Sequence, residues 1–307
     1  MNNYFLIWLN WPEKCFRANE GTLQFLSSVV GADSTIRMVT DEAEFLAELP
    51  RATHAIVWQF KEEWFDAAPK LRLLATPGAG RELLPRSAPH GIKIHFGGYH
   101  GKIIAESVAG FMLAWCHGFF RPEHSLPWGR TPMGDKCYLL DGTKAVILGY
   151  GKIGKAIAQK LQLLNVRTFG INRSNIANLT EEIKDCDWLV MALPSDTGTD
   201  NLLDAALLSK LPPKAVVINI GRGNSVDEAA LLDALRSGAI QGAYLDVFKN
   251  EPGLLSNIGN MVSHDDHETI LGNSHLPWNL ITMPHSSAFC PEYLNLCIKE
   301  LVDEGLI

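Results

Sequence analysis

The sequence has no closely spaced cysteine pair, no long apolar run and no excess of positive charge. Its six cysteines never form a C-x-x-C pattern, which argues against zinc and disulfide frameworks and is typical of reduced thiols in the cytoplasm. The apolar stretch from Tyr4 to Leu9 is too short to span a membrane, and no basic segment precedes it. We therefore expect a first β-strand there, and a cytoplasmic protein without a membrane partner.

The balance of charge also limits the partners of this chain. The formal net charge is -7 at pH 7, which argues against an electrostatic nucleic-acid binder. A small anionic ligand would need positive charge concentrated at its site. Internal repeats and low-complexity tracts are absent from the sequence.

The length and the apolar pattern predict two α/β domains. With 307 residues, of which 47% are hydrophobic and 20% charged, the chain has an ordinary globular composition and the length of two domains. We expect two flavodoxin- or Rossmann-like parallel-sheet domains with a cleft between them. The first would comprise residues 1–101 and 287–307 and bind substrate. The second would comprise residues 102–286, bind a dinucleotide and begin with an interdomain helix at 102–119.

Short apolar runs between turn residues give the expected strands, and apolar spacing gives the expected helices. The strands are 4–9, 34–39, 55–58, 73–76 and 93–95 in the first domain, and 145–148, 167–171, 188–191, 215–220, 242–247 and 280–282 in the second. Helices are expected at 23–30, 42–49 and 292–304. In the helix at 102–119, an apolar stripe that ends at Phe119 predicts a face that packs in the core or lines a domain or subunit interface.

A glycine motif follows the first strand of the second domain. Gly149, Gly151 and Gly154 form G-x-G-x-x-G between a buried strand and a helix, the context in which the pattern indicates a dinucleotide site. Gly149 would permit the tight turn, Gly151 the approach of a pyrophosphate, and Gly154 close packing of the helix on the sheet. The helix N-terminus would then face the phosphates. A glycine-rich turn with another purpose is the alternative.

The next strand lacks the acidic residue that usually binds the ribose of NAD. The end of this strand, eighteen residues after Gly154, carries Asn172, followed by Arg173 and Ser174. Arg173 can pair with a 2′-phosphate, and its neighbours can supply hydrogen bonds. We therefore expect NADP(H) to be preferred, with NAD(H) possible. The alternative is a solvated loop arginine in an NAD enzyme.

Three further chemical groups follow strands of the second domain. Arg222 stands between two glycines after the strand at 215–220, and its guanidinium suits a carboxylate. Glu251 and His285 follow the next two strands. Since ligands bind outside the carboxyl ends of parallel strands, these residues are candidates for one site. A surface turn arginine is the alternative for Arg222.

Taken together, these motifs resemble the D-isomer-specific 2-hydroxyacid dehydrogenase family. The resemblance covers about residues 70 to 300 and rests on the order of the glycine motif, Leu193-Pro194, Gly221-Arg222-Gly223, 245–248, Glu251-Pro252 and Pro284-His285. Residues 99–101 before the interdomain helix look most like glyoxylate/hydroxypyruvate reductases. The resemblance implies hydride transfer between NADP(H) and a small anionic 2-oxo or 2-hydroxy acid.

The resemblance also implies a role for each matching residue. His285 would be the acid/base, Glu251 would orient it, and Arg222 would bind the substrate, as would the backbone of Ala79 and Gly80. Asp246 would hold the nicotinamide carboxamide. The cofactor site would comprise Gly149, Tyr150, Gly151, Lys152, Ile153, Gly154, Asn172, Arg173, Ser174, Leu193, Pro194, Thr199, Ile220, Gly221, Asp246 and His285. A homodimer is expected.

The segment between Glu251 and His285 departs from the family by its length. Residues 253–274 form an insertion with His264, Asp265, Asp266, His267 and Glu268. Their spacing matches no standard ligand pattern, so we expect an exposed insertion and no metal site. The insertion also leaves an alternative function open: a nucleotide-sensing binding protein of the same fold, similar to the corepressor relatives of the family, which would recruit partners through this surface.

Overall fold

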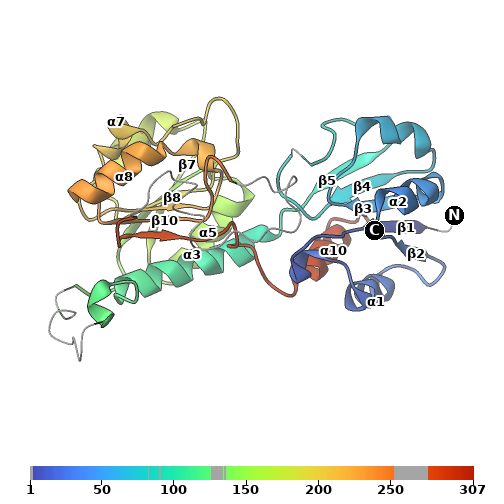
Figure 1. Ribbon diagram of the computed structural model, residues 1–307, viewed down its shortest axis with the longest axis horizontal. Helices are drawn as coiled ribbons and strands as arrows, with labels where there is room; N and C mark the ends of the chain where they lie inside the picture. Colours follow the sequence, from blue (N-terminus) through green and yellow to red (C-terminus); the bar gives the residue numbers. More distant parts are fainter. Residues whose placement is uncertain (1–2, 82, 90, 126–133, 135, 252–275) are drawn as a thin grey trace. The chain divides into compact units, whose positions relative to one another are not determined.

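The computed structural model describes residues 3–81, 83–89, 91–125, 134, 136–251 and 276–307. The chain divides into two compact units, of which unit 1 is Met1–His100 with Phe289–Ile307 and unit 2 is Gly101–Ala288. Each unit contains one sheet in which every described strand pair is parallel (Figure 1). The predicted class, two parallel-sheet α/β domains, is confirmed.

Unit 1 has the flavodoxin-like strand order β2-β1-β3-β4-β5. Its strands are β1 (Tyr4–Trp8), β2 (Thr35–Met38), β3 (His54–Val57), β4 (Leu73–Thr76) and β5 (Lys93–Phe96). Its helices are α1 (Glu20–Val29), α2 (Glu42–Glu48) and α10 (Tyr293–Asp303), with short 3-10 turns η1 (Lys14–Phe16), η2 (Leu49–Arg51) and η3 (Glu62–Ala67).

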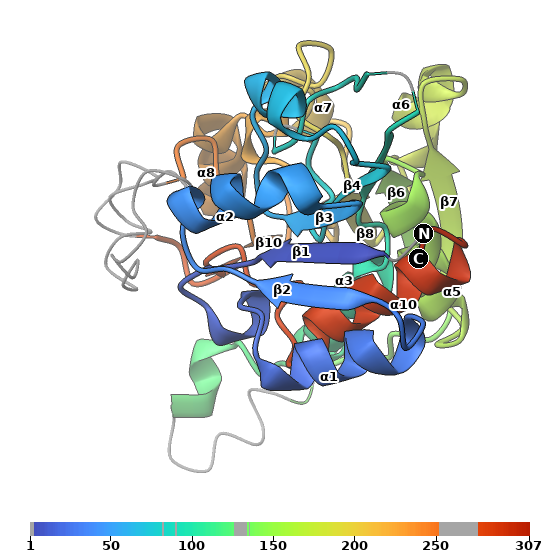
Figure 2. The same cartoon turned by 90° about the vertical axis from the view of Figure 1, so that its right-hand side faces the viewer.

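Helices cover both faces of the sheet of unit 1, with α1 and α10 on one face and α2 on the other (Figure 2). Successive side chains of a strand point to opposite faces of the sheet, which explains this arrangement. Ile7 of β1 borders a small cavity with residues of α1 and α10, whereas its neighbour Leu6 belongs to the same core cluster as Phe45 of α2. Burial on both faces requires continuous apolar strands, which β1 and residues 55–57 of β3 provide.

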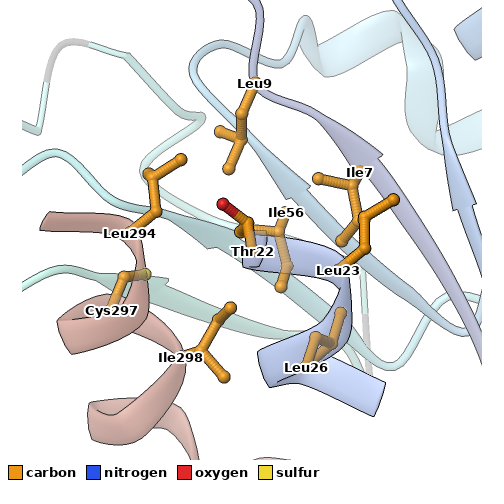
Figure 3. Close-up of a pocket in the computed structure, with 9 residues that line it drawn as sticks. All are labelled: Ile7, Leu9, Thr22, Leu23, Leu26, Ile56, Leu294, Cys297 and Ile298. Atoms are coloured by element: carbon orange, nitrogen blue, oxygen red, sulfur yellow. The ribbon is translucent and has the colours of Figure 1, made fainter. Parts of the chain in front are cut away.

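The small cavity in unit 1 is almost entirely aliphatic (Figure 3). Its polar groups are the hydroxyl of Thr22 and the thiol of Cys297. The other lining residues are Ile7, Leu9, Leu23, Leu26, Ile56, Leu294 and Ile298. A cavity without a charged side chain offers nothing to neutralise a carboxylate, so we do not assign it to an acidic substrate.

Unit 2 has the order β11-β10-β9-β8-β6-β7. Its strands are β6 (Lys144–Leu148), β7 (Arg167–Ile171), β8 (Trp188–Met191), β9 (Val216–Asn219), β10 (Gly242–Leu245) and β11 (Leu280–Thr282). Its helices are α3 (His100–Cys116), which begins at the last residue of unit 1, α5 (Lys152–Gln162), α6 (Leu179–Glu182), α7 (Ala205–Leu208) and α8 (Glu228–Ser237), with 3-10 turns η4 (Pro122–Ser125), η5 (Ile176–Asn178) and η6 (Gly223–Ser225). Every strand predicted for the two units is present, with each end within two residues of its predicted position.

The four central strands of unit 2, β6, β8, β9 and β10, are also buried on both faces. In β6, Ala145 and Ile147 pack in one cluster with α3 and α5, whereas Val146 and Leu148 pack in another with α6, α7 and α8. Fully buried strands of a parallel sheet must therefore be apolar at successive positions, as these are. These central strands therefore present their ends and the loops that follow them for chemistry.

The predicted bounds of the helix at 102–119 differ from those of α3. The helix begins two residues earlier, at His100, and ends at Cys116. Gly118 has a φ of 72°, the left-handed conformation that terminates helices. Phe119 lies beyond this turn and is 67% exposed, so its predicted place within the helix is wrong.

Candidate active site

The predicted chemical groups of unit 2 lie at one edge of its sheet. Because all six strands are parallel, the residues after β6, β8, β9, β10 and β11 emerge from the same side. The strand order reverses between β6 and β8, since β7 lies on the other side of β6. Such a switch point is where doubly wound sheets bind their ligands.

The turn after β6 is tightly packed against the end of β8. Gly149 has a φ of 102°, and a Cβ at this position would lie 2.4 Å from the carbonyl oxygen of Ala192. The same loop approaches a second glycine, since a Cβ at Gly221 would lie 2.6 Å from the backbone nitrogen of Leu193. Glycines from two loops thus enclose Ala192 and Leu193, immediately before Pro194.

The start of α5 suits a pyrophosphate. Gly151 is the N-cap of the helix, so no capping side chain covers its first turn, and that turn contains no acidic residue. A Cβ at Gly151 would meet no atom within 4 Å, so this side of the backbone is open. Helix N-termini bind phosphates through their first N–H groups and the helix dipole. The residues present therefore fit a dinucleotide.

The turn after β7 is held by its own side chains. Asn172 Oδ1 accepts hydrogen bonds from the backbone nitrogen of Ser174 at 2.9 Å and from its hydroxyl at 2.6 Å. Arg173 extends from this turn with its side chain 89% exposed, and its Nη2 lies 2.6 Å from Asp196 Oδ2. An ion pair thus joins the loops after β7 and β8.

Thr199 fixes the loop after β8. Its hydroxyl lies 2.9 Å from the Pro194 carbonyl oxygen and 2.8 Å from that of Asp196, and it accepts the backbone N–H of Asp196 at 3.2 Å. Thr199 is only 7% exposed. In this structure the hydroxyl therefore organises the loop that carries Pro194 and Asp196.

The loops that carry Arg222 and Glu251 pack without space for a side chain between them. A Cβ at Gly223 would lie 1.8 Å from the backbone carbon of Phe248. The backbone oxygen of Arg222 is held by the side chains of Asn219, at 3.2 Å, and Ser225, at 2.7 Å. Ile220, which precedes this loop, is 6% exposed. The loops after β9 and β10 can approach this closely because position 223 is a glycine, without a Cβ.

Glu251 and His285 form a hydrogen-bonded ion pair. Nδ1 of His285 lies 2.9 Å from Oε2 of Glu251, while Oε1 accepts the backbone N–H of Phe248 at 2.9 Å. Burial acts to lower the pKa of His285, but the hydrogen bond and charge of Glu251, together with the charge of Asp246, outweigh it and raise the pKa above its ordinary value.

The pKa of Glu251 shifts in the opposite direction. Burial acts to raise it, but the hydrogen bond and charge of His285, the Phe248 N–H and the charge of Arg222 together lower it. The charge of Arg222 also acts on His285, where it opposes the rise in pKa. The structure therefore brings Arg222, Glu251 and His285 into one electrostatic unit.

Asp246 fixes the backbone around His285. The histidine has a φ of 52°, an uncommon left-handed conformation, and its N–H donates to the Asp246 carbonyl oxygen at 2.9 Å. The Asp246 carboxylate accepts the N–H of Ser286 at 2.8 Å and that of Ser287 at 3.1 Å. Burial raises the pKa of Asp246, which is only 2% exposed, against the opposing effects of His285 and these donors. Its predicted contact with the nicotinamide stays a prediction beside this positioning role.

Two features of the site were not predicted from the sequence. The first is Asp196, whose partner Arg173 is 23 residues away on another loop. The second is the Ser286 hydroxyl, which is buried beside His285 and has no hydrogen-bond partner among the described residues. A buried hydroxyl without a partner fits a site completed by a polar group of a ligand.

Other predicted features lie elsewhere or outside the described residues. Ala79 and Gly80 follow β4 in unit 1, and their role in substrate binding stays a prediction. The insertion 253–274, with its histidines and acidic residues, lies outside the part of the chain that the structure describes. Within the described part, His, Cys, Asp and Glu residues form no group of three that could hold a metal, and no helix has the length and hydropathy needed to cross a membrane.

Comparison with known proteins identifies similar chains. The family model for the D-isomer specific 2-hydroxyacid dehydrogenase, NAD binding domain, matches residues 109–285. Glycerate dehydrogenase of Methylorubrum extorquens is 29% identical over 250 residues, which cover 76% of this chain and 75% of that protein.

Two solved structures share the fold over nearly the whole chain. The NAD-complexed D-isomer specific 2-hydroxyacid dehydrogenase from Lactobacillus delbrueckii ssp. bulgaricus aligns with a TM-score of 0.76 and 16% identity, covering 99% of this chain and 96% of that one. The corresponding protein from Xanthobacter autotrophicus Py2, in complex with NADPH and MES, aligns with a TM-score of 0.68 and 22% identity, covering 97% and 94%.

Proposed function

The chain belongs to the D-isomer specific 2-hydroxyacid dehydrogenase family, and on that premise we propose that it reduces a small anionic 2-oxo acid to the D-2-hydroxy acid with NADPH. The observation that carries this proposal is the His285–Glu251 pair beside Arg222 at the carboxyl ends of β9, β10 and β11. This arrangement provides a proton donor and a cation at one place. When bound, the reduced nicotinamide supplies the hydride.

His285 acts as the general acid in this proposal. Glu251 takes the Nδ1 side of the ring, so the proton to be transferred is carried on Nε2. The raised pKa favours the protonated ring, as reduction of a carbonyl requires. In the oxidative direction, neutral His285 removes the hydroxyl proton. Proton transfer by a positioned side chain contributes about 10²- to 10⁴-fold to turnover.

Arg222 binds the substrate in this proposal. Its guanidinium can hold the substrate carboxylate and polarise the adjacent carbonyl. Hydrogen bonds from the side chains of Asn219 and Ser225 to the backbone oxygen of Arg222 fix the backbone from which the guanidinium extends. An anchored cation in a protein of net charge -7 supplies the local positive charge that an anionic substrate requires.

The preference for NADP(H) rests on Arg173. The turn after β7 carries this arginine, which can pair with a 2′-phosphate, and lacks the carboxylate that usually binds the free ribose hydroxyl of NAD. NAD(H) remains the second cofactor of this proposal. The two aligned structures were solved with different dinucleotides, NAD in one and NADPH in the other.

The test is the oxidation of NADPH, followed by absorbance, with a panel of small, branched and aromatic 2-oxo acids. We expect activity with at least one acid and a loss of about 10²- to 10⁴-fold in kcat in His285→Gln, with NADPH binding retained. Arg222→Ala should lose turnover and raise KM for the acid. Activity with none of the acids, or near-wild-type turnover in His285→Gln, would contradict the proposal.

A further inference from the structure

The ion pair between Arg173 and Asp196 crosses the place where the proposed cofactor binds. Arg173 follows β7 and Asp196 follows β8, and these strands flank β6 in the sheet. The pair therefore joins two loops across the end of β6, where the glycine turn begins. The cation on which the proposed NADP(H) preference rests thus already has an anionic partner.

Asp196 is a fixed partner rather than a passing surface contact. Its Oδ1 accepts the N–H of Gly198 at 2.9 Å, and its backbone N–H donates to Thr199. The aspartate side chain is 33% exposed, against 89% for Arg173. The carboxylate is therefore anchored within the loop after β8, and the exposed side chain of Arg173 extends to it.

From this geometry we propose that Asp196 determines how strongly the enzyme discriminates between NADPH and NADH, because its carboxylate competes with the 2′-phosphate for Arg173. This inference rests on the proposed dinucleotide site. The 2′-phosphate, with a charge of about -1.5 to -2, would have to displace the Asp196 carboxylate from the guanidinium of Arg173. The carboxylate would also repel the phosphate. NADH has no phosphate at this position, so its binding is unaffected by the competition.

The size of the effect follows from the exposure of the pair. Exposed ion pairs are weak, so Asp196 reduces NADPH affinity without blocking it. Removing one exposed unit charge near the phosphate, in a medium close to water and screened by salt, changes affinity about three- to tenfold. The discrimination of the natural enzyme is therefore below the level that Arg173 alone would give.

The test is Asp196→Asn in the full-length protein, with dissociation constants for NADPH and NADH measured by tryptophan fluorescence. Asparagine retains an Oδ1 acceptor for Gly198 and so preserves the loop. We expect NADPH to bind about three- to tenfold more tightly and NADH to change less than about twofold. In an Arg173→Gln background, Asp196→Asn should increase NADPH affinity less, because no guanidinium remains for the carboxylate and the phosphate to compete for.

Asp200→Asn is the matched control. Asp200 lies four residues further along the loop and accepts a hydrogen bond from the Asn224 side chain. The substitution Asp200→Asn removes the same charge from the same loop and leaves the Arg173–Asp196 pair intact. Both dissociation constants should therefore stay within about twofold of wild type.

The outcomes separate this inference from the proposed function. Tighter NADPH binding in Asp196→Asn supports the role of Asp196 even if the wild type prefers NADH, which would contradict only the proposed NADP(H) preference. Unchanged or weaker NADPH binding, or an equal gain for NADH, overturns the role of Asp196. A full gain in the Arg173→Gln background overturns the competition for Arg173. Binding of neither dinucleotide overturns both proposals.

Discussion

At the scale of single residues, the central feature is that Glu251 and His285 each shift the ionisation of the other. The raised pKa of His285 and the lowered pKa of Glu251 both favour the charged pair. A histidine whose pKa is raised on folding stabilises the protein below its unfolded pKa, and this contribution is lost as the pH rises through the folded pKa. In the proposed reduction, protonated His285 is also the active form, so activity falls over the same window.

Replacing Glu251 by Gln should therefore move the pH dependence of reduction. Without the carboxylate, burial lowers the pKa of His285, and reductive kcat/KM should decline at a lower pH than in wild type. The measurement is the pH profile of NADPH oxidation with an active 2-oxo acid. A profile that keeps its position despite lower activity would show that Glu251 does not set the ionisation of His285.

Glu228→Gln is the control for this experiment. The Glu228 carboxylate accepts the N–H of Lys249 at 2.7 Å, on the loop that leads to Glu251. Its loss removes a neighbouring carboxylate while the Glu251–His285 bond remains. We expect the pH profile of this variant to keep nearly the wild-type position.

At the scale of elements, the strand–turn–helix from β6 to α5 assigns different tasks to its glycines. Gly149 has a left-handed φ and lies against the end of β8, whereas Gly151 has an ordinary φ of -86° and open space around its missing Cβ. The first glycine is required by the fold. The second leaves room for the proposed pyrophosphate.

Alanine at these two positions should therefore have separable effects. Gly149→Ala should destabilise the protein by at least roughly 1–3 kcal/mol, because strain at a positive φ adds to the overlap with Ala192. Gly151→Ala should keep nearly the wild-type thermal midpoint but weaken binding of both dinucleotides. Thermal unfolding and cofactor titration of the two variants provide the measurement. A normal midpoint in Gly149→Ala, or normal cofactor binding in Gly151→Ala, would contradict this division.

At the scale of the whole molecule, the chain leaves unit 1 at His100 and returns to it at Phe289. The returning segment is firmly part of unit 1, because Glu300 of α10 accepts the backbone N–H of Gly98 at 2.8 Å and lies 3.1 Å from the buried His95. The proposed cofactor site lies wholly within unit 2. Cofactor binding should therefore stabilise unit 2 directly.

Thermal unfolding with added cofactor tests this expectation and the proposed cofactor choice together. A ligand at about 100 times its dissociation constant, bound only by the native state, adds about 2.7 kcal/mol, which corresponds to a shift of roughly 5–10 °C for a unit of this size. We expect a larger shift with NADPH than with the same concentration of NADH. Arg173→Gln should reduce the NADPH shift to the NADH level. Equal shifts in the wild type would contradict the proposed preference for NADP(H).

The sequence by itself determined the elements and most of the candidate site. Short apolar runs between turn residues located the predicted strands, and most clearly the central ones, because a strand buried on both faces must be apolar along its length. Arg222, Glu251 and His285 could be grouped from sequence, because the ends of parallel strands share one edge. The end of α3 was misplaced, since the spacing of apolar residues continues past the glycine that terminates the helix.

Only the tertiary structure decided which groups pair. Arg173 and Asp196 meet across β6, and Asp246 holds the turn after His285 forty residues away. No local pattern encodes these contacts, because they depend on strand order and on the conformation of loops from separate strands. The same chain that places an arginine at the proposed cofactor site thus also supplies the carboxylate that pairs with it, and folding alone brings the two together.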